Sequence, residues 1–333
     1  MMTSARLKIP GSLKSTQLLV LAWTGHFFGS DYLAPRRIAN PDGDDIELYF
    51  TQDRRRLAEA NAVWFHAPSI TDLPRAKNQP WILMSMESDA NYPALKNPYT
   101  RLAFDLSMTY RLDADIPCIY PNWRHYGTFL EPPPVHKGKS SGALAVYIAS
   151  NPVEYRDTYV RELMEYIPVD SLGSCLNNAH IKDFVAGGWS SRGTWSSILS
   201  VLPRYKFYLA FENSQTIDYV TERAFHALVC GVVPVYLGAA NVREFMPDDD
   251  AVIIASEFSS VAELADYLRY LDANDVAYEK HLSWKRDGYS ERFRRLVDLG
   301  SIDSQLRMAV KLTHGCDKSC RCGGRLRELG EIE

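Results

Sequence analysis

Short apolar runs separated by polar stretches follow one another along the whole chain. In the first half, five of them predict strands: Leu18–Trp23, Ile46–Phe50, Ala62–His66, Trp81–Met86 and Leu102–Phe104. Arg54–Ala60 predicts a short helix between the second and the third. Such alternation of strands and helices is typical of a parallel sheet with crossover helices.

The second half repeats this scheme. Three apolar runs predict strands at Ala143–Ala149, Phe207–Phe211 and Val232–Leu237, and helical periodicity predicts helices at Tyr155–Tyr166, Tyr219–Cys230 and Ser260–Asn274. Gly231 directly follows the second helix, where a glycine C-cap is favoured. The pattern therefore predicts two Rossmann-like βαβ domains of the α/β class that face each other across a cleft. In such open sheets a ligand binds outside the carboxyl ends of the strands.

The clearest breakpoint is Glu131–Gly142, which combines three prolines with lysine, glycine and serine. These residues cannot continue a helix or a central strand, so the segment reads as an interdomain linker. We therefore expect a first domain at residues 1–135, a linker at 136–142, a second domain at 143–310 and a cysteine-containing tail at 311–333.

Composition and charge exclude several classes of protein. The chain has 333 residues, of which 46% are hydrophobic and 23% charged, which is ordinary for globular domains. Its formal net charge of −4 argues against a general nucleic-acid binder, which would carry a basic face. The apolar stretch Leu18–Trp23 is too short to cross a bilayer, and no signal-peptide cleavage pattern follows it. We expect a soluble chain, with any membrane anchor outside it.

Six cysteines fall into two groups. Three lie singly and are expected to be small buried side chains: Cys118, Cys175 and Cys230. Cys316, Cys320 and Cys322 cluster near the C-terminus, which favours a disulfide in an oxidising compartment. A zinc site with His314 is the alternative, although the spacing does not form a Cys-x-x-Cys pair.

The stretch Tyr205–Gly238 carries the candidate chemistry. Its strand ends at Phe211, and the next helix is expected to begin near Tyr219 with Asp218 as N-cap. A helix N-terminus offers free N–H groups and partial positive charge, which suit a diphosphate. One crevice should therefore hold Glu212, Asn213, Tyr219, Glu222 and Arg223. Alternatively, a glutamate in a first helical turn merely complements the helix dipole.

The same stretch resembles the donor-binding motif of the α-1,3-fucosyltransferases, glycosyltransferase family 10. The matching residues are Phe211-Glu212-Asn213, Tyr219-Val220-Thr221-Glu222-Arg223 and Val233-Pro234-Val235 before Gly238. The family usually has lysine where this chain has Arg223. The substitution replaces a compact ammonium group by a planar guanidinium group. The resemblance implies a GT-B-type fold and GDP-fucose as donor.

The resemblance extends upstream. Ser150–Cys175 resembles the segment that opens the donor domain, and its arginine, implied to contact the diphosphate, falls on Arg156. Met86–Pro93 resembles the family's Glu-Ser-Pro region, and its general base falls on Glu87. A solvated helix-start arginine and an ordinary surface glutamate are the plain alternatives for these two residues.

The implied reaction inverts the anomeric carbon and forms an α-1,3 linkage, with GlcNAc of a glycan or glycoprotein as the expected acceptor. Glu87 would take the acceptor's proton, and Arg156 and Arg223 would neutralise the leaving GDP. Asn213 and Tyr219 would position phosphate or ribose. Glu222 would bind sugar hydroxyls, and either Glu212 or Glu222 would stabilise an oxocarbenium-like centre.

No Asp-x-Asp follows a strand of the second domain, so no required metal or cofactor is expected. A divalent cation such as Mn²⁺ could still stimulate transfer. The resemblance places the full-length protein in the Golgi lumen as a type II membrane protein. Two alternatives stay open: a GT-B enzyme with another nucleotide-sugar donor, and a catalytically impaired homologue that binds nucleotide or glycan.

Overall fold

The structure is a computed structural model of the chain. It describes residues 17–25, 35–38, 46–75, 77–92, 95, 97–121, 129, 142–184 and 194–314. The contacts divide the chain into two compact units. Unit 1 comprises the chain up to Ile119 and again from Asp298 onward, and unit 2 comprises Tyr120–Val297.

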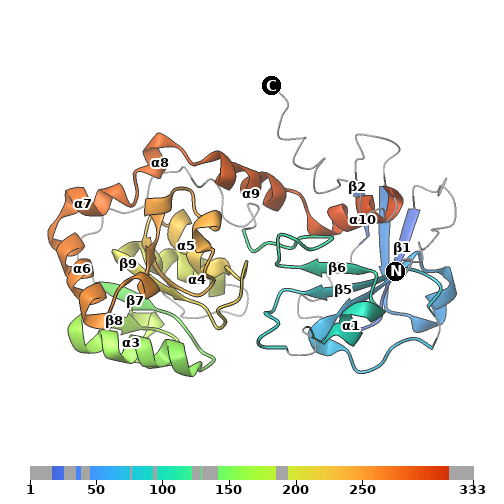
Figure 1. The fold of residues 1–333 in the computed structure, drawn as a ribbon, viewed down its shortest axis with the longest axis horizontal. Helices are drawn as coiled ribbons and strands as arrows, with labels where there is room; N and C mark the ends of the chain where they lie inside the picture. The colour runs from blue at the N-terminus through green and yellow to red at the C-terminus, as the bar shows by residue number, and fades with distance from the viewer. Residues whose placement is uncertain are drawn as a thin grey trace, which may run out of the picture. The chain divides into compact units, whose positions relative to one another are not determined.

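Unit 1 is built on a six-stranded sheet (Figure 1). Its strands are β1 (Gln17–Ala22), β2 (Arg36–Ile38), β3 (Ile46–Thr51), β4 (Ala62–His66), β5 (Trp81–Ser85) and β6 (Leu106–Thr109), in the order β2-β3-β1-β4-β5-β6. All neighbours are parallel except β2, which runs antiparallel to β3. The short helices are Arg54–Glu59 and Ala67–Ser69, both 3₁₀, and α1 (Pro98–Ala103).

Two apolar layers cover the two faces of this sheet. One face packs against α10 (Ser304–His314), whose Met308, Ala309 and Leu312 join strand residues such as Trp64 in one core. The other face buries Phe65 and Trp81 beneath Phe104. In Figure 1 the red helix α10 lies against the blue strands of unit 1.

Unit 2 is built on a five-stranded parallel sheet in the order β11-β10-β9-β7-β8. Its strands are β7 (Ala145–Tyr147), β8 (Val169–Ser171), β9 (Phe207–Phe211), β10 (Val233–Leu237) and β11 (Ile253–Ile254). Because β8 and β9 lie on opposite sides of β7, the connection reverses direction between β7 and β9. Such a switch point is where α/β sheets bind ligands.

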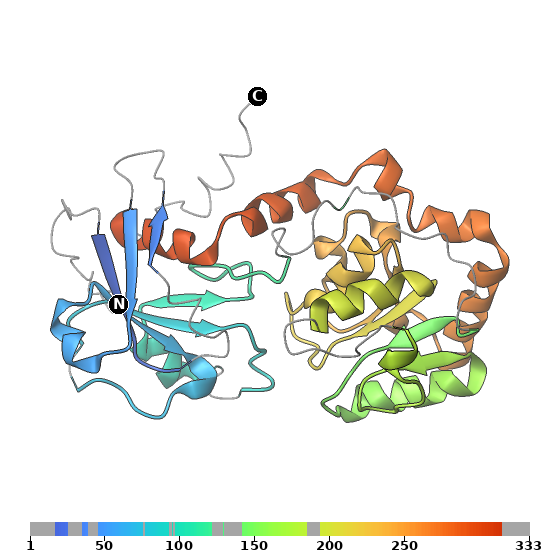
Figure 2. The ribbon, with the colours of Figure 1, turned by 180° about the vertical axis from the view of Figure 1, so that it is seen from behind.

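Helices cover both faces of the second sheet, and Figure 2 shows them from behind. One face packs against α3 (Glu154–Tyr166) and α6 (Val261–Ala273) through residues such as Val160, Leu163 and Leu264. On the other side, α5 (Glu222–Val229) contacts β9 and β10. The remaining helices are α4 (Thr194–Val201), α7 (Asp275–Lys280), α8 (Trp284–Asp287) and α9 (Glu291–Ser301), with short 3₁₀ helices at Ile181–Asp183, Leu202–Arg204, Val242–Phe245, Asp249–Ala251 and Ala255–Glu257.

Most predicted strands and helices are confirmed, and both sheets have the predicted parallel core. Leu102–Phe104 is wrong as a strand, because Leu102 and Ala103 end α1 and Leu102 is 79% exposed. The next strand, β6, begins four residues later at Leu106. Its buried and half-buried positions alternate within only four residues, too few to give a clear pattern.

The domain boundaries differ from the expected ones. The second domain was expected to run to residue 310, but Met308 and Ala309 are buried in the core of unit 1. A helix packs wherever its apolar face finds a partner, and sequence order does not decide which sheet supplies it. Residues 131–141 of the expected linker lie outside the described residues.

Cys118, Cys175 and Cys230 are buried free thiols, as predicted. The predicted disulfide and the alternative zinc site at Cys316, Cys320 and Cys322 lie outside the described residues. In the described part of the chain, no helix is long and apolar enough to cross a membrane.

Candidate active site

A buried carboxylate lies at the carboxyl end of β9, beside the switch point of the second sheet. Glu212 has 0% exposure, and both of its oxygens accept hydrogen bonds from Thr221. The Thr221 amide donates to Oε1 at 2.7 Å, and its hydroxyl donates to Oε2 at 2.7 Å. Glu212 thereby ties the end of β9 to the residue that precedes α5.

Arg223 completes this network. Its guanidinium donates to the Thr221 hydroxyl at 3.0 Å and lies 3.4 Å from Oε2 of Glu212. The Glu222 carboxylate lies 3.7 Å from the same guanidinium nitrogen. The Arg223 side chain keeps 21% exposure, so a cation fixed by two carboxylates still reaches solvent at the start of α5. That arrangement suits an anionic ligand.

Burial shifts the pKa values of this network. Desolvation raises the pKa of Glu212 to about 7, although Arg223 and the Thr221 hydrogen bonds act in the opposite direction. Burial disfavours the charged form of Arg223, but the carboxylates of Glu222 and Glu212 outweigh it and raise its pKa. Arg223 is therefore a permanent cation, whereas the charge of Glu212 can change near neutral pH.

The first residue and the N-cap of α5 differ from those expected from the sequence. The helix begins at Glu222 with Thr221 as N-cap, not near Tyr219 with Asp218 as N-cap. Asp218 has a φ of 66°, in the left-handed region, and its carboxylate accepts from the side chain of Asn241 at 2.9 Å. The Thr221 hydroxyl gives its hydrogen bond to Glu212 and leaves the helix end uncapped by a side chain.

The expected donor-binding residues divide into accessible and buried ones. Arg223, Glu222, with 26% side-chain exposure, and Asn213 reach the surface. The Oδ1 atom of Asn213 is buried and has no hydrogen-bond partner in the described structure, so it is an acceptor suited to a hydroxyl donor. Tyr219 is buried, and its carbonyl accepts from the Tyr236 hydroxyl at 3.2 Å.

The side chains of Arg156 and Glu212 are buried and hydrogen-bond to other groups of unit 2. The Arg156 guanidinium has 1% exposure and donates to the carbonyls of Asn151, at 2.6 Å, and Phe211, at 3.4 Å. It thus joins the loop after β7 to the end of β9. The expected direct contacts of Arg156, Glu212 and the buried Tyr219 with the donor stay predictions.

Glu87 lies in unit 1, two residues after the end of β5. Its amide donates to the Ser85 hydroxyl at 3.1 Å, and that hydroxyl donates back to the Glu87 carbonyl at 2.9 Å. Asn91 donates to its carboxylate at 3.4 Å. This turn fixes the backbone and leaves the half-exposed carboxylate at the carboxyl edge of the sheet.

Two residues that shape the site, Thr221 and Gly238, were not predicted from the sequence. Thr221 stood inside the recognised motif but had no role assigned to it. Gly238 lies so close to Glu212 that a Cβ atom would be 2.6 Å from its Cγ and 2.5 Å from the Tyr236 hydroxyl. The Gly after an apolar strand was visible in the sequence, but only tertiary structure shows what it approaches.

The described residues contain no cluster of three or more metal-ligating side chains. Within the Asp113-Ala114-Asp115 stretch, Asp113 pairs with Arg111 at 2.7 Å, and Asp115 accepts from the amide of Ser107 at 2.9 Å. Both aspartates therefore already have protein partners.

Two family models match the chain. The model described as glycosyltransferase family 10 (fucosyltransferase) C-term matches residues 136–317, more than half of the 333 residues. The chain belongs to this family. A second model, described as fucosyltransferase, N-terminal, matches residues 15–121. Membership confirms the resemblance drawn from the motif around Glu212.

Curated relatives of this family are similar over about two thirds of the chain. GDP-fucose protein O-fucosyltransferase 3 of Rattus norvegicus is 35% identical over an alignment of 243 residues that covers 68% of this chain and 48% of the relative. The protein of the same name from Homo sapiens is 35% identical over an alignment of 240 residues. That alignment covers 68% of this chain and 49% of the relative. The chain thus spans about half the length of the curated relatives it matches.

Solved structures share the fold. A crystal structure of α1,3-fucosyltransferase with GDP aligns with a TM-score of 0.58 at 17% identity, covering 95% of this chain and 94% of that one. A second, with GDP-fucose, aligns with a TM-score of 0.53 at 18% identity, covering 85% and 88%. The GT-B-type fold with two parallel-sheet α/β domains is therefore confirmed.

Proposed function

We propose that this protein transfers L-fucose from GDP-fucose to a hydroxyl group of a protein. Family membership supports the fucosyl transfer, and the names of the curated relatives support a protein acceptor. The acceptor is thus a protein hydroxyl in place of the glycan GlcNAc expected from the motif. The α-1,3-fucosyltransferase structures are only 17–18% identical, so their likeness speaks for the fold and not for the linkage.

One observation carries the proposal: the network of Glu212, Thr221 and Arg223 at the start of α5. It fixes a cation that still reaches solvent, beside free helix N–H groups and next to the switch point of the sheet. A leaving nucleoside diphosphate develops negative charge, which such a preorganised cation stabilises. Arg223 can do this without a divalent metal, so we propose metal-independent transfer.

The proposed reaction is a single displacement with inversion. The acceptor hydroxyl oxygen attacks the anomeric carbon of fucose, and a new C–O bond forms as the bond from that carbon to the GDP oxygen breaks. Glu87 takes the proton that the attacking hydroxyl loses, and GDP leaves with the bonding electron pair. Glu222 and the unpartnered Oδ1 of Asn213 would accept hydrogen bonds from hydroxyls of the donor.

The Glu87→Gln variant tests the base. General-base catalysis contributes roughly 10²- to 10⁴-fold, so we expect kcat to fall about 100-fold or more while the Kd for GDP stays unchanged. Transfer would be measured by mass spectrometry of an acceptor protein incubated with GDP-fucose, and GDP binding by calorimetry. Glu59→Gln is the matched control, because Glu59 is an exposed glutamate of the same unit that pairs only with Arg56 in the described contacts.

The outcomes separate three possibilities. Full activity of Glu87→Gln would place the base elsewhere and leave the transfer intact. GDP binding by the wild-type protein without turnover on any acceptor would favour an impaired homologue. Turnover only with a donor other than GDP-fucose would overturn the proposed donor.

A further inference from the structure

Ser85 is the last residue of the first sheet before the proposed base. It ends β5, has 0% exposure and lies beside Thr109 of β6. Because β5 lies between β4 and β6, strands on both sides hold its carboxyl end in place. Glu87 follows two residues later, outside the strand. A contact between Ser85 and Glu87 therefore connects the base to the most rigid part of unit 1.

One hydroxyl group holds both backbone groups of Glu87. The Oγ atom of Ser85 accepts from the Glu87 amide at 3.1 Å and donates to the Glu87 carbonyl at 2.9 Å. The amide and the carbonyl lie on opposite sides of the Glu87 Cα atom. The two hydrogen bonds together therefore set the direction in which the glutamate side chain leaves the backbone.

The segment after Glu87 is held by its own hydrogen bonds. The buried Ser88 accepts from the amide of Ala90 through its hydroxyl, at 3.0 Å, and from the amide of Asn91 through its carbonyl, at 3.1 Å. The side chain of Asn91 donates to the Glu87 carboxylate at 3.4 Å. The turn that carries Glu87 thus has a defined shape, and the Ser85 hydroxyl ties this turn to the sheet.

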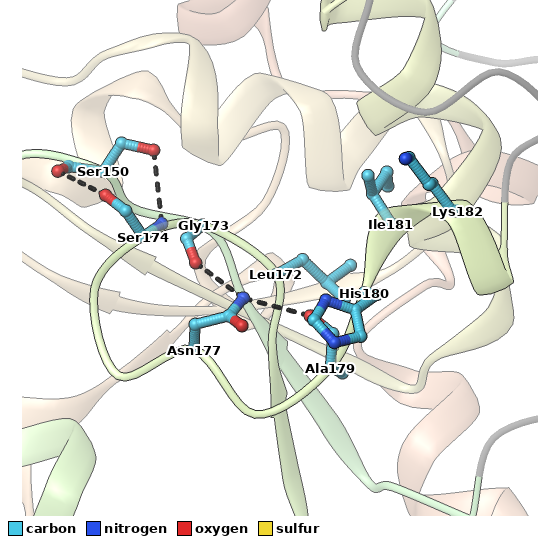
Figure 3. A pocket seen from close by; sticks show the side chains of 9 residues that line it. All are labelled: Ser150, Leu172, Gly173, Ser174, Asn177, Ala179, His180, Ile181 and Lys182. Atoms are coloured by element: carbon cyan, nitrogen blue, oxygen red, sulfur yellow. Dashed lines mark hydrogen bonds between the residues drawn. The ribbon is translucent and has the colours of Figure 1, made fainter.

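A serine hydroxyl also holds loop backbone in unit 2, but with a different arrangement. In Figure 3, the Ser174 hydroxyl donates to the carbonyl of Ser150 at 2.7 Å and joins two loops that follow different strands. That bond connects two segments and orients no acidic side chain. The Ser85 hydroxyl instead holds two peptide groups of a single residue, and that residue is the proposed base.

The position of a general base decides how well it works. It has to lie roughly 2.6 to 3.2 Å from the atom whose proton it takes. A displacement of about 1 Å can lower the rate about 100-fold. Because Glu87 is half-exposed, its backbone has to supply much of this precision.

We propose that Ser85 is a positioning residue for fucosyl transfer. Its hydroxyl fixes the backbone of Glu87 and so directs the carboxylate at the hydroxyl group that attacks fucose. Ser85 itself touches neither donor nor acceptor, because its side chain is buried beneath the turn. This inference rests on the proposed function, since it requires Glu87 to be the base.

Ser85→Ala tests the positioning role, because it removes the hydroxyl and keeps a small buried side chain. The assay is GDP release from GDP-fucose, with water in place of the acceptor hydroxyl, so that Glu87 takes a proton from water. We expect kcat to fall about 10- to 100-fold, while the donor KM and the Kd for GDP stay within about twofold of wild type. In the Glu87→Gln background the same substitution should change kcat by less than about twofold, because its effect passes through Glu87.

Ser107→Ala is the matched control. Ser107 lies on the neighbouring strand β6, and its hydroxyl also exchanges two hydrogen bonds with one acidic residue. It donates to the Asp115 carboxylate at 2.8 Å and accepts from the Asp115 amide at 3.0 Å. Both serine variants should unfold at a lower urea concentration than the wild type, but Ser107→Ala should keep the wild-type kcat.

The outcomes separate this inference from the proposed function. Wild-type kcat in Ser85→Ala, with a reduced kcat in Glu87→Gln, would overturn the positioning role and leave the proposed function standing. An equal loss of kcat in both backgrounds, or an equal loss in Ser107→Ala, would also overturn it. Full activity of Glu87→Gln would overturn it together with the assignment of the base. A wild-type protein that releases no GDP from GDP-fucose would overturn the proposed function itself.

Discussion

At the scale of single residues, Thr221 connects the two charges of the candidate site. Its hydroxyl donates to Glu212 and accepts from Arg223, and its amide donates to the other carboxylate oxygen of Glu212. In Thr221→Val the buried Glu212 would lose one donor while the shape of the residue is nearly kept. A buried acceptor left unsatisfied costs about 1 to 3 kcal/mol, so the free energy of unfolding should fall by that amount.

Thr221→Ser is the control for this prediction, because it keeps the hydroxyl. Urea denaturation would give the free energy of unfolding of both variants, and calorimetry their Kd for GDP. Equal stability and GDP affinity of the valine variant and the wild type would show that the hydroxyl does not connect Glu212 with Arg223.

Gly238 determines how closely β10 approaches the buried carboxylate. In Gly238→Ala the new methyl group would collide with Glu212 and the Tyr236 hydroxyl, both less than 3 Å away. Overpacking of this kind costs about 1 to 3 kcal/mol, so thermal unfolding should occur at a lower temperature. Gly25→Ala is the comparison, because a Cβ atom there meets nothing within 4 Å. A similar melting temperature of the two variants would contradict the close approach at Gly238.

At the scale of elements, α5 combines two tasks. Its first turn presents Arg223, and its next turn buries His226 against the core of unit 2. Burial, helped by the charge of Arg223, lowers the pKa of His226 to about 3. Protonation of this imidazole therefore disfavours the folded state.

The folded protein binds fewer protons at His226 than the unfolded chain between pH 3 and 6.5. The free energy of unfolding should therefore fall as the pH is lowered from 6.5 to 4, by up to about 1.4 kcal/mol per pH unit from this residue. His226→Phe should reduce that slope, as measured by urea denaturation at a series of pH values.

The pH dependence of stability that Glu212 contributes has the opposite sign. Its raised pKa makes the folded state bind more protons than the unfolded chain between pH 4.5 and 7. Its contribution to stability is full below pH 4.5 and is lost as the pH rises through 7. Both proteins in the His226→Phe comparison keep Glu212, so the difference between their slopes isolates the histidine. Identical slopes would show that His226 titrates normally in the folded state.

At the scale of the whole molecule, the chain returns to unit 1 after building unit 2. Helix α10 completes the first core with the fully buried Met308. Met308→Ala should lower the free energy of unfolding by about 2 to 5 kcal/mol, because it leaves a cavity against the sheet.

Leu102→Ala in the same unit is the matched control, because Leu102 is largely exposed and its truncation should change stability by less than about 0.5 kcal/mol. Urea denaturation followed by tryptophan fluorescence can report on unit 1, where Trp64 and Trp81 are buried. Equal effects of the two truncations would mean that α10 does not complete this core.

The family and most of the strands could be read from the sequence. Runs such as Ala62–His66 and Phe207–Phe211 are buried on both faces of parallel sheets, so every position is apolar and the signal is strong. Short or partly exposed strands such as β6 and β11 gave no such signal. The motif from Phe211 to Arg223 also predicted a shared site, because a strand end and the following helix start meet at one edge of a sheet.

The amino-acid sequence by itself determined the α/β class, the parallel sheets and the set of charged residues gathered after β9, because periodicity and residue order are local properties of the chain. Only the tertiary structure decided which of those residues are exposed and which are buried. Arg156 and Glu212 are ionisable yet buried: the carbonyls of Asn151 and Phe211 accept from Arg156, and Thr221 and Arg223 contact Glu212. Burial and hydrogen-bond partners arise from packing between distant segments, which no local pattern encodes.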